Sequence, residues 1–335
     1  MMKAFLIEKP NNGSVCELPL PELMEDEVLI EVAAVGVCGT DVHIFKGEYF
    51  GGYPRVPGHE FCGTIVKKGN HAKLYEIGQF VTADPNMFCE SCDACKENHQ
   101  NFCQNFHAAG VSRHGAYAQF VAIPERCVFD ITGFTPEEGA MIEPLACVVY
   151  GQERAGVPLG GNVLIFGAGP IGLMHLQLAA KNGAAAVTVV DLFPHKLELA
   201  KKLGADFVYT AEEWKTCGQK NHYELVIDAT GVPAAVEQEM PYVKDAGTWL
   251  IFGVCPENSR ISINPYEIFR RELKILGSYS LKKTTGKAIA LIRSKKIDVE
   301  SLIENRLALD EVSDFFHSCS DLNPHMKTVI YPNQK

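Results

Sequence analysis

The sequence predicts an α/β protein with two domains, one made of short strands and one made of strands that alternate with helices. Before about residue 131, short apolar segments are separated by Gly, Pro and Asn turns, which is typical of an antiparallel β-barrel or sandwich. From residue 161 strands and helices alternate, which indicates βαβ units around a parallel sheet. The length of 335 residues agrees with two domains.

The strands predicted for the first part are short and apolar, and the clearest are residues 28–32, 63–66, 79–82 and 117–121. A helix is predicted to follow them. Thr135 can cap it, Pro136 suits the first helical position, and Glu138 completes a capping box. We expect this helix to end near Glu143, because Pro144 disfavours a helical conformation for the residue before it.

The second part is predicted to alternate regularly. Strands are expected at residues 162–166, 186–190, 207–209, 224–228 and 248–252, and helices at residues 171–181, 194–203 and 233–243. The tail after residue 276 contains two helical stretches and a closing strand at residues 327–330, and we expect it to pack on the first domain. The predicted domains are residues 1–147 with 276–335, and residues 148–275.

Composition and charge exclude several classes of protein. Lys and Arg number 31 against 41 for Asp and Glu, and the net charge of −10 argues against a nucleic-acid partner. No apolar run approaches the roughly 20 residues that span a membrane. Glu8 interrupts the first apolar residues before a signal-peptide core can form, so we expect a cytoplasmic protein. Twelve cysteines in a reducing compartment indicate metal binding or burial rather than disulfides.

A glycine-rich segment, residues 167–172, follows a predicted strand and begins a predicted helix. Gly167 allows a tight turn, Gly169 lets a pyrophosphate approach the backbone, and Gly172 lets the helix pack against the sheet. Asp191 ends the next strand, where an acid binds the ribose hydroxyls and repels a 2′-phosphate, so NAD is favoured over NADP. The other cofactor-binding candidates are Pro170, Ile171, Lys196, Gly253 and Val254. For Lys196, a solvated surface position is an equal alternative.

Four cysteines, Cys89, Cys92, Cys95 and Cys103, form a Cys-x2-Cys-x2-Cys-x7-Cys pattern in a polar lobe at about residues 84–104. Four thiolates can bind one tetrahedral zinc, which would stabilise a lobe too polar to form its own core. A disulfide pair is disfavoured by the compartment, and an iron–sulfur cluster is an alternative by ligand type. We predict a structural zinc, because four protein ligands leave no open position for chemistry.

A second set of metal-ligand types lies in three separate segments. Cys38 begins Cys-Gly-Thr-Asp-Val-His, His59 and Glu60 lie in Gly-His-Glu, and Glu143 begins Glu-Pro-Leu. Cysteine, histidine and carboxylate can together bind a catalytic zinc that keeps an open coordination position. Taken singly, each has a simpler explanation as a buried cysteine, a loop histidine or a helix end.

With these motifs in this order, the chain resembles the zinc-dependent medium-chain dehydrogenase/reductase family, and within it the sorbitol (polyol) dehydrogenase branch. The resemblance covers essentially the whole chain. It implies a GroES-like β-barrel catalytic domain, a Rossmann NAD-binding domain, and one catalytic and one structural Zn²⁺ per chain. It also implies Cys38 and His59 as ligands of the catalytic zinc, with Glu60 and Glu143 competing for the third position, and a homodimer or homotetramer.

The resemblance implies that the protein oxidises a secondary alcohol of a polyol to a ketose. Zinc lowers the pKa of an alcohol that it binds, and the nicotinamide ring of NAD accepts the hydride. Thr40 is expected to take the proton of the substrate, and the resemblance implies its passage through the nicotinamide ribose to His43. A cofactor-binding protein that has lost this chemistry is a rival hypothesis, disfavoured because every candidate ligand is present.

The identity of the substrate is less well defined by the sequence. A simple alcohol, threonine or a phosphorylated polyol is the alternative to a sugar alcohol. In the sorbitol dehydrogenases, an arginine that contacts the substrate follows a glycine corresponding to Gly277, and this chain has no arginine there. Arg113 and Tyr117 are candidates for a replacement polar contact.

Overall fold

The computed structural model describes residues 1–49, 52–318 and 325–334, and the chain divides into two compact units. The first unit comprises Met1–Pro144, Ala288–Arg293 and Val299–Lys335, and the second comprises Leu145–Lys287 and Ser294–Asp298. The chain returns to the first unit later than the predicted boundary at residue 276. The reason is β15 (Lys274–Gly277), which pairs with a strand of the second unit and keeps the chain there.

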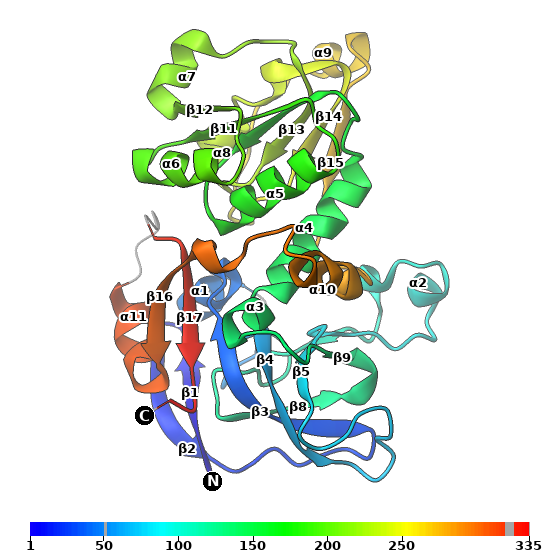
Figure 1. Ribbon diagram of the computed structural model, residues 1–335, viewed down its shortest axis with the longest axis vertical. Helices are drawn as coiled ribbons and strands as arrows, with labels where there is room; N and C mark the ends of the chain where they lie inside the picture. The colour runs from blue at the N-terminus through cyan, green and yellow to red at the C-terminus, as the bar shows by residue number, and fades with distance from the viewer. Residues whose placement is uncertain (50–51, 319–324, 335) are drawn as a thin grey trace. The chain divides into compact units, whose positions relative to one another are not determined.

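The first unit is built on a seven-stranded sheet of order β16-β17-β3-β4-β5-β9, with β8 paired to β3 beside this path. Only the β16–β17 pair is parallel among the described strands of this sheet. Its strands are β3 (Glu27–Gly36), β4 (Glu60–Lys68), β5 (Phe80–Ala83), β8 (Phe120–Pro124), β9 (Val128–Asp130), β16 (Ile303–Ala308) and β17 (Lys327–Tyr331). Figure 1 shows β17, near the C-terminus, beside β3.

Two small antiparallel pairs complete the strands of the first unit: β1 (Met2–Lys9) with β2 (Asn12–Leu18), and β6 (Asn86–Met87) with β7 (His107–Ala108). The apolar faces of these strands enclose one core. Phe5 from β1 stacks on Phe316 from α11 (Val312–Ser318) with ring centroids 5.3 Å apart, so the C-terminal tail contributes to this core.

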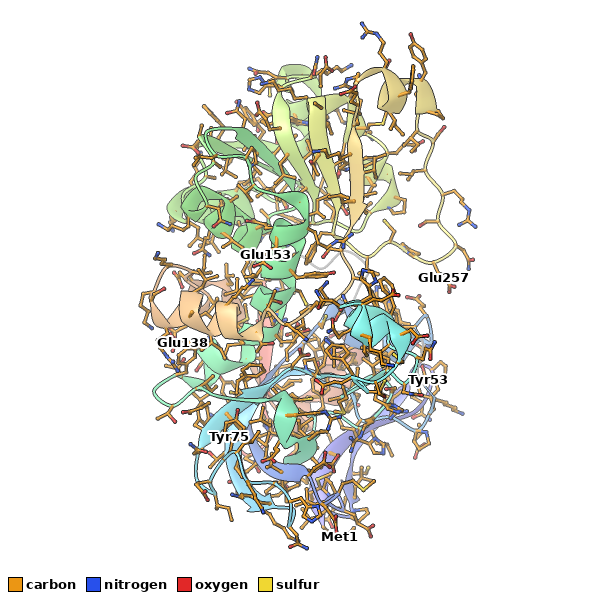
Figure 2. The ribbon with its side chains drawn as sticks, turned by 90° about the vertical axis from the view of Figure 1, so that its right-hand side faces the viewer. Met1, Tyr53, Tyr75, Glu138, Glu153 and Glu257 are labelled. Atoms are coloured by element: carbon orange, nitrogen blue, oxygen red, sulfur yellow. The ribbon has the colours of Figure 1, made fainter. Side chains whose placement is uncertain are left out.

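The helix predicted from Thr135 begins as expected. The Thr135 hydroxyl accepts a hydrogen bond from the Glu138 N–H at 3.1 Å, and the Glu138 carboxylate accepts one from the Thr135 N–H at 3.0 Å; Figure 2 labels Glu138. The predicted end near Glu143 is wrong. Helix α3 (Pro136–Ala140) ends earlier, and α4 (Ile142–Ala155) begins at once. Pro144 lies in the first turn of α4, where its missing N–H has no partner within the helix.

The second unit contains a parallel six-stranded sheet of order β12-β11-β10-β13-β14-β15, the arrangement of a doubly wound nucleotide-binding fold. Its other strands are β10 (Asn162–Phe166), β11 (Ala186–Asp191), β12 (Phe207–Thr210), β13 (Tyr223–Asp228) and β14 (Val243–Ile251). The five strands predicted for this part are confirmed, with shifts of a few residues at their ends. Buried apolar side chains such as Leu164, Val226 and Trp249 form the core of this unit.

The helices that lie wholly in the second unit are α5 (Pro170–Lys181), α6 (Pro194–Lys202), α7 (Ala211–Cys217), α8 (Pro233–Val236) and α9 (Pro265–Arg270), while α4 and α10 (Thr285–Arg293) have residues in both units. The single helix predicted over residues 233–243 is wrong. Helix α8 ends at Val236 and a short 3₁₀ turn, Met240–Tyr242, follows it, because Pro241 has no N–H to donate to a continuous α-helix. Across the described residues, no helix combines the length and the apolar character needed to cross a membrane.

Candidate functional site

Helix α1 (Gly39–Lys46) arranges three of the predicted site residues. Cys38 is its N-cap, and the Cys38 N–H donates to the Asp41 carboxylate at 2.9 Å. Thr40 and His43 lie three residues apart and therefore share one face of the helix. The Nδ1 atom of His43 hydrogen-bonds the Glu48 carboxylate at 2.8 Å. A thiol, a hydroxyl and an imidazole thus follow one another along one short helix.

The pairing of β3 with β4 brings His59 and Glu60 to this helix. Glu60 is the register partner of Gly36, two residues before Cys38. One ligand atom each from Cys38, His59 and Glu60 lie within 4.8 Å of one another, and the histidine and the glutamate are buried. Sulfur, nitrogen and carboxylate oxygen are the donor types of zinc sites with three protein ligands and one open position, so these residues fit the metal.

Asp41 contacts two members of this set, Cys38 and His59. Its buried carboxylate accepts hydrogen bonds from the Tyr117 hydroxyl at 2.8 Å and the Gly58 N–H at 3.2 Å, and lies 3.5 Å from Nδ1 of His59. Burial opposes ionisation of Asp41, but the neighbouring His59 and the hydrogen bonds from the Cys38 N–H and the Tyr117 hydroxyl outweigh it and lower its pKa. Burial likewise opposes the charged form of His59, but Asp41 and Cys38 raise its pKa well above the usual value. The Asp41 carboxylate therefore faces Nδ1 of His59, which leaves Nε2 for a metal.

The sequence interpretation assigned no role to Asp41. The signal was present, because an acid three residues after an N-cap residue matches the spacing of a capping box.

Lys327 on β17 is a further site residue that the sequence interpretation missed. Its buried ammonium forms an ion pair with Glu60. Burial disfavours the charged lysine, but Glu60 and Cys38 outweigh it and raise its pKa. Gly36 makes room for the pair, because a Cβ there would lie 2.2 Å from Oε2 of Glu60 and 2.9 Å from Cε of Lys327. No local pattern marks Lys327, since its partners are far away in the sequence.

Glu143 lies in the first turn of α4 with its side chain buried. Its charge contributes to the raised pKa of Lys327, after the larger contributions of Glu60 and Cys38. Among the described residues, however, the set of mutually close ligand atoms contains Glu60 and not Glu143. Of the two carboxylates considered for the third ligand position, the structure brings Glu60 to Cys38 and His59.

The four lobe cysteines form a second compact group. The Sγ atoms of Cys89 and Cys95 are 4.0 Å apart and those of Cys92 and Cys103 are 3.9 Å apart. Four sulfurs at about 2.3 Å from one zinc are separated by about 3.8 Å, whereas a disulfide needs about 2.0 Å. Hydrogen bonds from Ser91 and from the Cys92 N–H lower the pKa of Cys89 to about 5. These residues therefore fit a tetrahedral metal.

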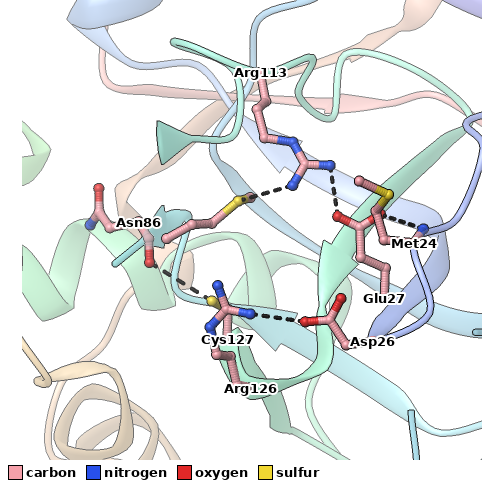
Figure 3. Close-up of polar contacts among 8 residues, drawn as sticks. Met24, Asp26, Glu27, Asn86, Arg113, Arg126 and Cys127 are labelled. Atoms are coloured by element: carbon pink, nitrogen blue, oxygen red, sulfur yellow. Dashed lines mark hydrogen bonds and ion pairs between the residues drawn. The ribbon is translucent and has the colours of Figure 1, made fainter. Parts of the chain in front are cut away.

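The base of this lobe is attached to the sheet by Arg113 (Figure 3). Its guanidinium donates to the Glu27 carboxylate at 2.7 Å and to Sδ of Met87 at 3.3 Å. Tyr117 is fully buried, with its hydroxyl bonded to Asp41. Both side chains are bound within the first unit, which does not support the substrate contact considered for them from the sequence.

The glycine-rich loop joins β10 to α5 in the second unit. Gly167 has a φ of +99°, which favours glycine. A Cβ at Gly172 would lie only 1.8 Å from the Gly167 carbonyl oxygen, so the helix and the turn are packed as closely as backbone allows. By contrast, no atom lies within 4 Å of a Cβ built on Gly169, the N-cap of α5. The N-terminus of the helix, including Pro170 and Ile171, thus faces space that a pyrophosphate can occupy.

Asp191 ends β11 beside this loop. Its carboxylate accepts hydrogen bonds from the Ala168 N–H at 2.6 Å and the Phe193 N–H at 2.8 Å. Lys196 is buried, with its ammonium 5.0 Å from the centre of the Phe193 ring, so the solvated surface position considered for it is wrong.

Gly253 and Val254 follow β14 at the same edge of the sheet. The Gly253 N–H donates to the Asp228 carbonyl at 3.0 Å, while the side chain of Val254 is exposed. The carboxyl ends of β10, β13 and β14 are neighbours in the sheet, and ligands of doubly wound folds bind at that edge.

Comparison with known proteins agrees with this geometry. Residues 24–133 match the model of the alcohol dehydrogenase GroES-like domain, and residues 170–294 match that of the zinc-binding dehydrogenases. D-altritol 5-dehydrogenase of Agrobacterium fabrum is 35% identical over 94% of this chain and 95% of its own length. Sorbitol dehydrogenase of Bacillus subtilis is 31% identical over 99% and 98% of the two chains.

A solved structure gives the same result for the fold. A zinc-binding dehydrogenase of Sinorhizobium meliloti, solved with NADP bound, is 34% identical, covers 99% of each chain and has a TM-score of 0.95. The GroES-like and Rossmann folds implied by the sequence motifs are therefore confirmed. The chain belongs to the zinc-dependent medium-chain dehydrogenase/reductase family and has polyol dehydrogenases among its relatives.

Proposed function

We propose that this protein oxidises a secondary alcohol of a sugar alcohol to a ketone, with NAD as the hydride acceptor. The observation that carries the proposal is the close grouping of sulfur, imidazole and carboxylate donors from Cys38, His59 and Glu60. The names of the altritol and sorbitol dehydrogenase relatives support a polyol as substrate. Simple alcohols, threonine and phosphorylated polyols are the alternatives to be compared with it.

Cys38, His59 and Glu60 would hold the catalytic zinc, and Glu143 is the alternative to Glu60. Zinc bound there would act as a Lewis acid and lower the pKa of a substrate hydroxyl. Asp41 keeps His59 in one orientation, and Lys327 compensates the charge of Glu60. Cys89, Cys92, Cys95 and Cys103 would hold a second, structural zinc, because all four positions of a tetrahedral site are then filled by protein.

Thr40 and His43 are suited to remove the proton that the alcohol loses. The hydroxyl of Thr40 lies two residues after the ligand Cys38 and can accept the proton of the substrate at Oγ1. His43 uses Nδ1 for its bond with Glu48, so the neutral ring carries its proton on Nδ1 and can accept another at Nε2. Glu48 thus selects the tautomer that makes His43 a proton acceptor.

Asp191 supports NAD rather than NADP as the cofactor. Its carboxylate lies at the end of β11 beside the glycine-rich loop, where a 2′-phosphate would meet a negative charge. The Sinorhizobium relative was solved with NADP, so both cofactors belong in the test. Comparison of the Kd values for NADH and NADPH tests this choice, and we expect NADH to bind more tightly.

A cytoplasmic location and a homodimer or homotetramer complete the proposal. Thiolate ligands such as those of the cysteine lobe persist best in a reducing compartment. The oligomeric state follows from the family resemblance and is tested by light scattering of the purified protein.

The decisive experiment is a substrate panel with metal analysis of the same sample. Altritol, sorbitol and arabinitol are compared with a simple secondary alcohol, threonine and a phosphorylated pentitol, each with NAD and with NADP. We expect the highest kcat/KM for a polyol with NAD. Failure of every polyol to produce NADH would refute the proposal, and a zinc-loaded but inactive protein would favour the cofactor-binding alternative.

A further inference from the structure

Two acidic side chains, Asp228 and Glu239, are buried together in the second unit, and both have a relative exposure of 0%. Asp228 is the last residue of β13, and Glu239 lies in the turn that follows α8. Two negative charges buried side by side are strongly unfavourable. The pair therefore needs an explanation, because the proposed reaction uses neither residue directly.

The contacts of Asp228 are those of an ionised carboxylate. Its Oδ1 accepts hydrogen bonds from the Thr230 N–H at 2.9 Å and the Thr230 hydroxyl at 2.6 Å, and its Oδ2 accepts one from the Gly231 N–H at 3.4 Å. All of these partners donate, and hydrogen bonds donated to a carboxylate stabilise its charged form. We therefore place the negative charge of the pair on Asp228.

The contacts of Glu239 are those of a neutral acid. Its Oε2 accepts a hydrogen bond from the indole N–H of Trp249 at 2.8 Å. Its Oε1 is buried and has no hydrogen-bond partner among the described residues, although the side chain faces Asp228. Two ionised carboxylates can only accept, but a proton on Glu239 turns their contact into a hydrogen bond. Burial, and then Asp228, raise the pKa of Glu239 to about 9, which agrees with a proton at neutral pH.

Asp228 in turn shapes the edge of the sheet beside the glycine-rich loop. Phe166 and Asp228 are register partners, and the Ala229 N–H donates to the Phe166 carbonyl at 2.8 Å. A Cβ on Gly167 would lie 3.0 Å from the Ala229 carbonyl oxygen. The turn held by Asp228 therefore packs directly on the first glycine of the loop.

Gly253 packs on the same turn from the other side. A Cβ there would lie 2.2 Å from the Gly231 nitrogen and 2.5 Å from Oδ2 of Asp228. The Asp228 carboxylate thus contacts both residues 229–231 and Gly253. We call these residues the wall beside the glycine-rich loop. Small displacements of this carboxylate would move backbone at the edge where a dinucleotide binds.

We propose that Glu239 is a positioning residue of the cofactor site. As a neutral acid it donates a hydrogen bond to the Asp228 carboxylate. This hydrogen bond fixes the wall of residues 229–231 and Gly253 against the nicotinamide dinucleotide. This inference rests on the proposed use of a nicotinamide cofactor. We expect its effect on cofactor affinity to act through Asp228, since Glu239 itself is fully buried.

Direct binding of NADH to the full-length, zinc-loaded protein tests this without turnover. Glu239→Gln keeps an acceptor for Trp249 and a donor for Asp228, so we expect a Kd within about twofold of the unmodified protein. Glu239→Leu removes both, and we expect the Kd for NADH to rise about tenfold. Trp249→Phe is the matched control: it removes the indole bond but not the contact with Asp228, so thermal stability should fall while the Kd stays within about twofold.

The pH dependence separates positioning from a general loss of stability. Glu239 is neutral below its pKa, so NADH affinity of the unmodified protein should fall as the pH rises through about 9, while Glu239→Gln shows no such fall. The titratable groups that face Glu239 are Asp228 and the half-buried thiol of Cys255. Cys255→Ser controls for the thiol and should keep the fall.

Three results would overturn the inference: unchanged NADH affinity in folded Glu239→Leu, an equal loss in Glu239→Gln, or identical pH profiles for the unmodified and Gln proteins. The comparison with Glu239→Gln remains decisive if the Leu variant does not fold. Loss of polyol oxidation with NADH binding intact would contradict the proposed function alone. Absence of NADH binding by the unmodified protein would contradict both.

Discussion

The glycine-rich loop offers a matched pair of substitutions that separates folding from cofactor binding. In Gly172→Ala, the new methyl group would lie 1.8 Å from the Gly167 carbonyl oxygen, so α5 and the turn must move apart. Overpacking of this kind costs about 1–3 kcal/mol, and a clash with backbone belongs at the upper end. With about 2–4 °C lost per kcal/mol in a domain of this size, we expect Tm to fall by roughly 6–12 °C.

Gly169→Ala should leave the stability almost unchanged and weaken cofactor binding instead. Its Cβ meets no atom within 4 Å, and its φ of −71° suits alanine, so the loss of stability should stay below about 1 kcal/mol. The methyl group would, however, occupy the space where the pyrophosphate approaches the backbone, and we expect the Kd for NADH to rise at least about tenfold.

Thermal unfolding with and without NADH, together with direct binding, measures both effects. We expect Gly172→Ala to lose stability already without NADH, and Gly169→Ala to keep its Tm but lose the shift that NADH produces. The reasoning is refuted if Gly169→Ala binds NADH like the unmodified protein, or if Gly172→Ala leaves Tm unchanged.

Three further predictions concern the first unit. Asp41→Asn should weaken catalytic zinc binding about 10–100-fold, because asparagine faces His59 without a negative charge. Competition with a chelator measures this affinity, and a variant that retains zinc as well as the unmodified protein would contradict the prediction. Lys327→Met leaves Glu60 as an unpaired buried charge and should lower the free energy of unfolding of the metal-free protein by about 3–5 kcal/mol. Equal denaturation midpoints for the variant and the unmodified protein would argue against this. Burial raises the pKa of Asp84 to about 7, so between about pH 4 and 7 its carboxyl binds a proton in the native state but not in the unfolded state. The free energy of unfolding should therefore fall as the pH rises through this range. Asp84→Asn should lack this slope when unfolding is measured as a function of pH.

The sequence predicted those parts of the fold whose causes are local. The alternation of strands and helices after residue 161 follows from periodicity, and the capping box at Thr135 follows from three residues. The two errors in the predicted helices came from prolines. Pro144 was interpreted as a helix end but occupies a tolerated first-turn position, while Pro241 breaks a stretch whose composition favoured helix.

The candidate site likewise contains residues that local motifs identify and residues that only the folded structure brings together. Cys38, His59 and the four lobe cysteines stand in compact motifs that indicate metal binding by residue type and spacing. Lys327 could not be identified, because its role exists only after β17 has placed it against Glu60. The grouping of Glu60 rather than Glu143 with Cys38 and His59 likewise follows from the register of β3 and β4, which no motif encodes.

The measurement that tests the central claim most directly is the zinc content of the unmodified protein and of Cys38→Ser, determined on the samples used for polyol oxidation. The account predicts about two zinc ions per chain in the unmodified protein and about one in the variant, with the cysteine lobe still loaded and NADH formation lost. A Cys38→Ser protein that keeps two zinc ions, or that still oxidises the polyol at the unmodified rate, would contradict it.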